Sequence, residues 1–115
     1  MFTGRHDLMI DNPAQLNYGI AVTDVDNDGA FEMVVAGFGF RNQVLKWNGD
    51  GFVDIAPPQM TDARRQAIGV AAGDIGTDGR EEIYILNTDT FAGRKRFGDR
   101  LFDFRDNKWV DLFAL

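Results

Sequence analysis

The sequence predicts an all-β protein that contains two copies of one four-stranded unit. Residues 18–33 match residues 68–83, which lie fifty positions later, so the chain contains an internal repeat. Within each copy, short apolar runs alternate with turns rich in glycine, asparagine and aspartate, while helical periodicity is absent. We therefore expect two four-stranded antiparallel sheets within a single domain over residues 1–115.

Repeat 1 is expected over about residues 17–56. Its strands are predicted at 18–23, 32–36, 43–47 and 52–56. The sequence Asn-Gly-Asp-Gly at 48–51 is typical of a hairpin turn between the last two strands. Pro57 and Pro58 then begin a polar connector over residues 57–65, because proline interrupts regular structure.

Repeat 2 is expected over about residues 66–113. Its strands are predicted at 67–73, 82–86, 100–105 and 108–112. After Leu86 the spacing between the copies grows from fifty to fifty-seven residues, since Trp47 matches Phe104. Seven additional residues have therefore entered the second copy, and insertions of this kind normally lie in surface loops.

The apolar patterns predict which strand faces are buried. The first two strands of each repeat are apolar without strict alternation, which predicts burial on both faces. The third and fourth strands alternate, which predicts one wetter face that carries Lys46, Asp54, Asp103 and Asp111. Four aromatic residues at matching positions are expected in the core, namely Trp47, Phe52, Phe104 and Trp109.

The composition narrows the function classes. The chain has no cysteine, no serine and one histidine, which excludes serine and cysteine nucleophiles and Cys/His metal sites. Its net charge of -6 argues against nucleic acid and anionic membranes as partners. No apolar run approaches the ~18 residues of a spanning helix, so no membrane insertion is expected, and residues 1–7 lack the pattern of a signal peptide.

Loop 1, residues 24–32, has the pattern of a calcium site. Its predicted ligands are the carboxylates of Asp24, Asp26, Asp28 and Glu32 and the backbone carbonyl of Ala30. Calcium prefers such oxygen ligands, and Gly29 permits the positive φ of a sharp turn. The competing interpretation is an ordinary solvated turn, but four carboxylates within nine residues repel one another, which favours a bound dication.

Loop 2, residues 74–82, repeats the pattern with one ligand fewer. Its predicted ligands are the carboxylates of Asp74, Asp78 and Glu82 and the backbone carbonyl of Arg80. Gly76 stands where loop 1 has Asp26, so the lower ligand charge predicts a weaker second calcium site or an unmetallated turn.

The two loops and their flanking strands resemble the FG-GAP/VCBS repeats of integrin-type β-propellers. Residues 15–26 and 79–88 are similar to the N-terminal repeats of the cartilage acidic protein family, and the resemblance covers about residues 12–113. It implies propeller-blade-like sheets and an extracellular, calcium-binding domain used for binding rather than catalysis. It also implies that the acidic residues of both loops are metal ligands, whereas Gly76 departs from the acidic third position of the family.

The leading interpretation is therefore a calcium-stabilised β-repeat module for adhesion or recognition, located outside the cell or at its surface, and not an enzyme. A carbohydrate-binding module is one alternative, because Phe38 and Phe91 lie in equivalent loops that could contact a protein or glycan partner. A self-assembling propeller unit is another, because two blades are fewer than the roughly four to eight of a closed propeller. That alternative predicts a homo-oligomer, or an outer strand formed by residues 1–3 that covers one exposed edge.

Overall fold

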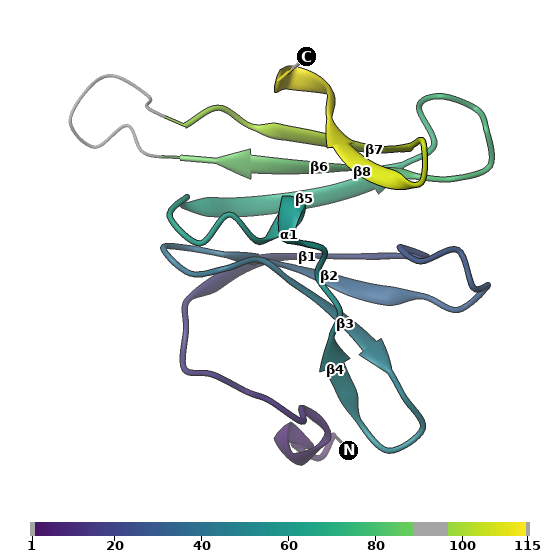
Figure 1. Cartoon of the computed structure of the whole chain (residues 1–115). Coiled ribbons are helices and arrows are strands. Elements are labelled where there is room, and N and C mark those ends of the chain that lie inside the picture. Colours follow the sequence, from purple (N-terminus) through teal and green to yellow (C-terminus); the bar gives the residue numbers. More distant parts are fainter. Residues whose placement is uncertain (1, 89–96, 115) are drawn as a thin grey trace.

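Two four-stranded antiparallel sheets make up the protein, as a computed structural model that describes residues 2–88 and 97–114 shows (Figure 1). Each sheet is a meander in which neighbouring strands follow one another along the chain, in the orders β1-β2-β3-β4 and β5-β6-β7-β8. The predicted all-β class with one four-stranded sheet for each repeat is therefore confirmed.

The strand boundaries follow the predicted ones closely. Repeat 1 forms β1 (Asn17–Thr23), β2 (Glu32–Gly37), β3 (Gln43–Trp47) and β4 (Phe52–Asp54). Repeat 2 forms β5 (Ala67–Gly73), β6 (Glu82–Asn87), β7 (Arg100–Arg105) and β8 (Lys108–Asp111). The helical elements of the described residues are short: η1 (His6–Leu8), α1 (Pro58–Thr61) and η3 (Leu112–Ala114). Within residues 2–88 and 97–114, no helix has the length and apolar character needed to cross a membrane.

The two sheets stack face to face, with β1 of the first sheet against β5 of the second (Figure 1). Gly19 of β1 and Gly69 of β5 lie against each other where the two strands meet. A Cβ atom added to Gly19 would lie 2.8 Å from the Cα of Gly69, which is shorter than van der Waals contact. The absence of a side chain at Gly19 therefore allows the backbones of the two repeats to meet.

The core lies between the sheets. The first sheet contributes Val34, Ala36 and Val44, and the second contributes Ile83, Ile85 and Phe102, each at most 1% exposed. Met33, which is the repeat-1 counterpart of Ile83, lies on the opposite face of its sheet from Val34. The repeats thus stack head to tail. The face of the second sheet that packs in the core is equivalent, by repeat position, to the outer face of the first sheet.

One outer face of the first sheet remains uncovered by the described residues. Tyr18, Ile20 and Val22 alternate along β1 and are 60%, 57% and 57% exposed. The prediction that the first two strands are buried on both faces is therefore wrong for β1. The cause is the head-to-tail stacking, which buries one face of each sheet and leaves the other face outside.

The matching aromatic residues show the same asymmetry. Trp109 is 6% exposed and packs edge-to-face on Phe104, with ring centroids 5.4 Å apart, so the core prediction is confirmed in repeat 2. Trp47 is 46% exposed and packs on Phe52 at 5.2 Å, so the same prediction is wrong for Trp47.

The connector between the repeats belongs to the core. It contains α1, whose Met60 is 1% exposed. The buried side chain of Asn42 donates a hydrogen bond to the Met60 carbonyl at 2.9 Å and accepts one from the amide of Gly37 at 3.0 Å. Because most of residues 57–65 are polar, the sequence did not predict that Met60 is buried.

Two acids that the alternation placed on a wetter face are instead structural acceptors. The side chain of Asp111 is 9% exposed and accepts hydrogen bonds from the amides of Leu101 and Phe113, both at 3.1 Å. Asp54 forms the equivalent bonds in repeat 1. In each repeat, the carboxylate therefore links the fourth strand to the start of the third strand. The prediction of a solvated face is wrong at these two positions.

The N-terminal segment follows a different path from the one predicted. Phe2 is fully exposed and residues 2–5 form no strand, so the proposed outer strand is wrong for the described part of residues 1–3. Instead, Met9 forms an isolated parallel bridge with Phe52, and the amide of Ile10 donates to the Phe52 carbonyl at 3.1 Å.

Candidate metal centre

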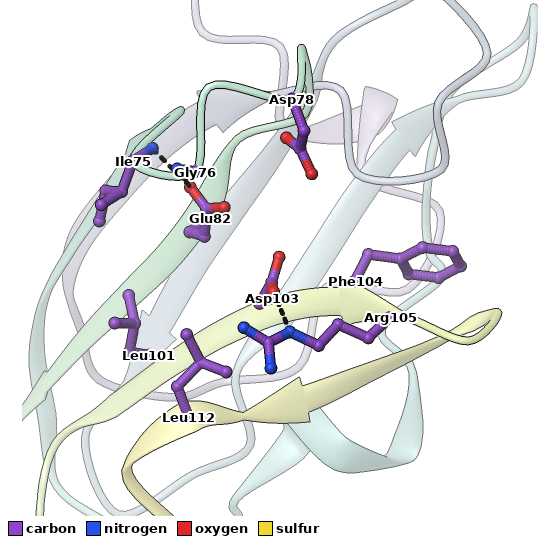
Figure 2. A pocket seen from close by; sticks show the side chains of 9 residues that line it. All are labelled: Ile75, Gly76, Asp78, Glu82, Leu101, Asp103, Phe104, Arg105 and Leu112. Atoms are coloured by element: carbon purple, nitrogen blue, oxygen red, sulfur yellow. Dashed lines mark hydrogen bonds and ion pairs between the residues drawn. The ribbon is translucent and has the colours of Figure 1, made fainter.

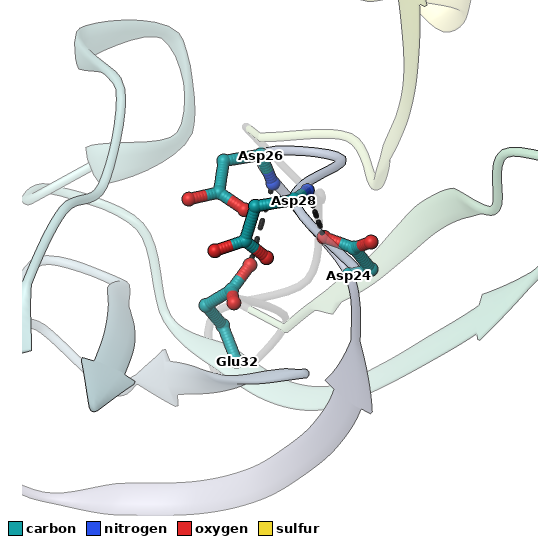
Figure 3. A group of neighbouring side chains, drawn as sticks. All are labelled: Asp24, Asp26, Asp28 and Glu32. Atoms are coloured by element: carbon teal, nitrogen blue, oxygen red, sulfur yellow. Dashed lines mark hydrogen bonds between the residues drawn. The ribbon is translucent and has the colours of Figure 1, made fainter. Parts of the chain in front are cut away.

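Loop 1 joins β1 to β2 and brings its four predicted carboxylates together. Asp24, Asp26, Asp28 and Glu32 each offer one oxygen, and these oxygens all lie within 4.8 Å of one another (Figure 3). Opposite ligands of a calcium ion are separated by about 4.6–5.2 Å, twice the usual bond length. One calcium ion therefore fits the spread of the four oxygens.

The backbone of loop 1 turns tightly around Asp24. Asn27 and Gly29 adopt positive φ values of 61° and 89°, as predicted for Gly29. The carboxylate of Asp24 accepts hydrogen bonds from the amides of Asp28 at 3.1 Å and Gly29 at 2.8 Å. These bonds occupy part of the acceptor capacity of Asp24, since an ionised carboxylate has about four acceptor positions.

Glu32 forms the buried floor of the cluster. It begins β2, is 1% exposed, and points its carboxylate toward Asp26 and Asp28 (Figure 3). Its Oε1 accepts hydrogen bonds from the amides of Val25 at 2.8 Å and Asp26 at 3.3 Å. Its Oε2 is buried and has no hydrogen-bond partner among the described residues. Burial raises the pKa of Glu32, and a bound cation would satisfy the free oxygen.

Lys46 places a positive charge against the cluster. Its Nζ donates to the carboxylates of both Asp26 and Asp28 from the adjoining strand β3. These contacts raise the pKa of Lys46 and hold the pKa of Asp28 at about 2. Sequence reasoning missed this role, because the alternation of β3 predicted only a solvated lysine.

Loop 2 repeats the same arrangement with fewer acids. Oxygens of Asp74, Asp78 and Glu82 lie within 4.8 Å of one another. At Gly76, a Cβ atom would lie 3.0 Å from Oε1 of Glu82, so a side chain at this position would crowd the carboxylate of Glu82. The backbone geometry is preserved, because Thr77 and Gly79 have φ values of 54° and 87°.

A cavity of about 490 Å³ adjoins loop 2, and it is lined in part by Asp78, Glu82 and Asp103 (Figure 2). Asp103 occupies the strand position that Lys46 occupies in repeat 1, fifty-seven residues earlier. Its carboxylate points toward loop 2 and accepts a hydrogen bond from Nε of Arg105 (Figure 2). The strand residue beside the acidic loop therefore has opposite charge in the two repeats.

Ala30 and Arg80 were predicted as carbonyl ligands, and this role stays a prediction. Their amides close the two turns by donating to Asp28 at 2.9 Å and Asp78 at 3.1 Å. The side chain of Arg80 has a further position that sequence reasoning missed. Its guanidinium donates to the carbonyl of Val25 in loop 1 at 2.6 Å.

The aromatic loops considered for ligand binding are partly engaged in packing. Phe38 packs edge-to-face on Tyr18, with ring centroids 5.3 Å apart. Phe97 lies under the guanidinium of Arg65, whose central carbon is 4.8 Å from the ring centroid. Phe91 lies outside the described residues, so the predicted aromatic surface stays a prediction.

Comparison with known proteins agrees with the repeat and loop geometry. The family model described as FG-GAP-like repeat matches residues 24–85, which include both acidic loops. Cartilage acidic protein 1 of Xenopus tropicalis is 48% identical over 99% of this chain, and its mouse counterpart in Mus musculus is 50% identical over 90% of this chain. The chain spans 20% and 18% of the length of these two relatives. More than half of the chain matches the family model, and the chain therefore belongs to the FG-GAP-like repeat family.

Proposed function

We propose that loop 1 binds one calcium ion and that this ion stabilises the packing of the two repeats. The ligands would be the carboxylates of Asp24, Asp26, Asp28 and Glu32, with the Ala30 carbonyl and water completing the shell. Calcium would supply the positive charge that relieves the mutual repulsion of these acids. Magnesium fits this loop less well, because it requires shorter bonds and a stricter octahedral geometry.

Glu32 is the observation that carries this proposal. A carboxylate that is 1% exposed, with one oxygen lacking a partner among the described residues, is costly to keep charged in a folded protein. Solvated turns hold their acids in water, whereas Glu32 is buried and its carboxylate lies toward Asp26 and Asp28 (Figure 3). A bound cation accounts for both the burial and the orientation.

Loop 2 would bind a second calcium ion more weakly. It offers the carboxylates of Asp74, Asp78 and Glu82 and the predicted carbonyl of Arg80, and water would replace the ligand lost at Gly76. The shared backbone geometry supports a common function for the loops. The lower ligand charge accounts for the expected difference in affinity.

The position of loop 1 explains how an ion there would act on the whole fold. Thr23, the last residue of β1, donates a hydrogen bond to Glu81 of loop 2 at 2.8 Å, and Arg80 binds the carbonyl of Val25. Fixing loop 1 would therefore also fix the contacts between the two sheets. Calcium would act as a structural staple rather than as a catalyst.

Extracellular adhesion or recognition, without enzymatic activity, is the biological role that we infer for this module. Membership in the FG-GAP-like repeat family supports it, and relatives that are named as acidic proteins of cartilage support an extracellular location. Calcium concentrations outside cells are high enough to fill sites with dissociation constants of roughly 10⁻⁴–10⁻³ M.

Thermal unfolding with and without calcium tests the proposed staple. We expect millimolar calcium to raise the melting temperature of chelator-treated protein by more than about 5 °C. Glu32→Gln should remove most of this increase, while Asp50→Asn, at an exposed acid of the β3–β4 turn, should retain it. A melting temperature that changes with neither calcium nor chelator would refute the proposal.

A second role, association with further four-stranded repeats, is favoured by the exposed face of β1. Tyr18, Ile20 and Val22 present apolar surface there, and the head-to-tail stacking gives the first sheet a face equivalent to the one that the second sheet buries. Light scattering over a range of concentrations would show a rise in mass that Ile20→Lys abolishes. A constant monomeric mass would oppose self-association.

A further inference from the structure

A positive charge, the ammonium of Lys46, lies beside the acidic loop 1. Lys46 lies on β3, and its ammonium contacts Asp26 and Asp28, two of the four acids of the loop 1 cluster. Its side chain is 27% exposed, so the ammonium is held against the loop rather than extended into solvent.

Calcium and this ammonium compete for the same oxygens. A dication that binds Asp26 and Asp28 would stand close to the ammonium and repel it, because like charges at a few ångströms raise the energy of both. An ammonium that donates to these two carboxylates also occupies their acceptor positions. The contacts of Lys46 must therefore break when an ion takes both carboxylates as ligands.

We propose that Lys46 is an internal competitor that sets the calcium affinity of loop 1. This inference rests on the proposed function of the loop. Without calcium, the lysine neutralises part of the acidic cluster and allows the carboxylates to remain close together. With calcium, the lysine swings away toward solvent, and the loss of its two ion pairs is subtracted from the binding free energy.

Repeat 2 provides an internal comparison. The corresponding strand position is the acid Asp103, and Arg105, which also lines the cavity beside loop 2, pairs with Asp103. Competition by a lysine is therefore a property of loop 1. Loop 1 combines the fuller set of acids with an occupant that a dication must displace, and it should bind calcium less tightly than its four carboxylates alone would allow.

Calorimetric calcium titration of the whole chain with a matched pair of lysine variants tests this inference. Lys46→Gln removes the competitor, and Lys108→Gln removes an exposed lysine of β8, so both variants change the net charge equally. We expect Lys46→Gln to bind calcium at loop 1 about tenfold more tightly than Lys108→Gln. Lys46→Met should behave like Lys46→Gln, since it also lacks the ammonium.

The melting temperature of the calcium-free protein gives a second readout. Loss of the neutralising lysine should lower it in Lys46→Gln relative to Lys108→Gln, and calcium should then raise it by a larger increment. Equal affinities and equal melting temperatures in the two variants would overturn the role of Lys46. If the wild-type chain binds no calcium but Lys46→Gln does, the competitor is supported and the proposed function of the natural loop fails. If no variant binds calcium, both fail.

Discussion

The guanidinium of Arg80 donates a hydrogen bond to the carbonyl oxygen of Val25, so a side chain of loop 2 holds the backbone of loop 1. The same guanidinium lies over the ring of Phe104, with 3.7 Å between its central carbon and the ring centroid. Val25 itself is 3% exposed and anchors loop 1 in the core. Arg80 therefore connects the two acidic loops with the aromatic core of repeat 2.

Replacing Arg80 by methionine should destabilise the fold by about 1–3 kcal/mol, because the Val25 carbonyl loses a charged donor and Phe104 loses its stacked cation. Urea unfolding at neutral pH measures this difference. Arg64→Met, at an exposed arginine of the connector, is the matched control and should change stability by less than about 0.5 kcal/mol. Equal effects of the two substitutions would contradict the connecting role of Arg80.

Gly19→Ala should destabilise the protein by about 1–3 kcal/mol, because its Cβ would lie 2.8 Å from the Cα of Gly69 and would separate the sheets. Gly69→Ala is the control, since its Cβ would meet only Leu86, at an ordinary 3.7 Å. Both changes give alanine in a β-strand, so the difference between them isolates the close contact. Thermal melting of both variants checks this, and equal melting temperatures would contradict the stacking.

Thr77→Asn should stabilise the protein by about 1 kcal/mol. Thr77 has a φ of 54°, which is unfavourable for a β-branched residue and tolerated by asparagine. Asn27 occupies the equivalent position of loop 1 with a φ of 61°, so Asn27→Thr is the reciprocal variant and should destabilise by a similar amount. Urea unfolding of the calcium-free proteins measures both changes, and two shifts of the same sign would refute this explanation.

The pH dependence of stability should contain a contribution from Asp111. Burial raises the pKa of Asp111, but hydrogen bonds from Arg100 and from the amides of Leu101 and Phe113 outweigh burial and lower the pKa overall. A carboxyl group with a lowered pKa stabilises the fold above its unfolded pKa of about 3.9, and this contribution is lost as pH falls through the folded value.

Asp111→Asn should therefore be less stable than the wild type by about 1–3 kcal/mol at pH 7, and the difference should shrink as the pH falls below about 4. Urea unfolding at several pH values checks the trend. Asp50→Asn, at an exposed acid, should show no comparable pH-dependent difference. A gap between Asp111→Asn and wild type that does not depend on pH would contradict this prediction.

The sequence predicts the strands and both acidic loops well, because these features depend on local patterns. Alternation, turn residues and the internal repeat place the eight strands of residues 2–88 and 97–114, and the spacing of Asp24, Asp26 and Asp28 identifies loop 1. The contacts of Lys46 and Arg80 could not be predicted in this way. They depend on how strands pair and how sheets stack, which brings together residues that are distant in the sequence.

The exposure of β1 illustrates the same limit. The residues on either side of Ile20 form the same apolar pattern as a buried strand. Ile20 is nevertheless 57% exposed. Which face of a repeat is covered depends on its position in the stack, and the repeated pattern carries no information about that position. Comparing repeat positions does show the opposite charges of Lys46 and Asp103 beside the two acidic loops, but not which face of a sheet is covered.

Calorimetric calcium titration of the chelator-treated chain, with Asp26→Ala and Asp78→Ala as separate variants, tests the central proposal most directly. We predict two binding events of unequal affinity in the wild type. Asp26→Ala should remove the tighter one, and Asp78→Ala should remove the weaker one, because these acids belong to loop 1 and loop 2 respectively. Absence of calcium binding to the wild-type chain at millimolar concentration would refute both proposed metal sites.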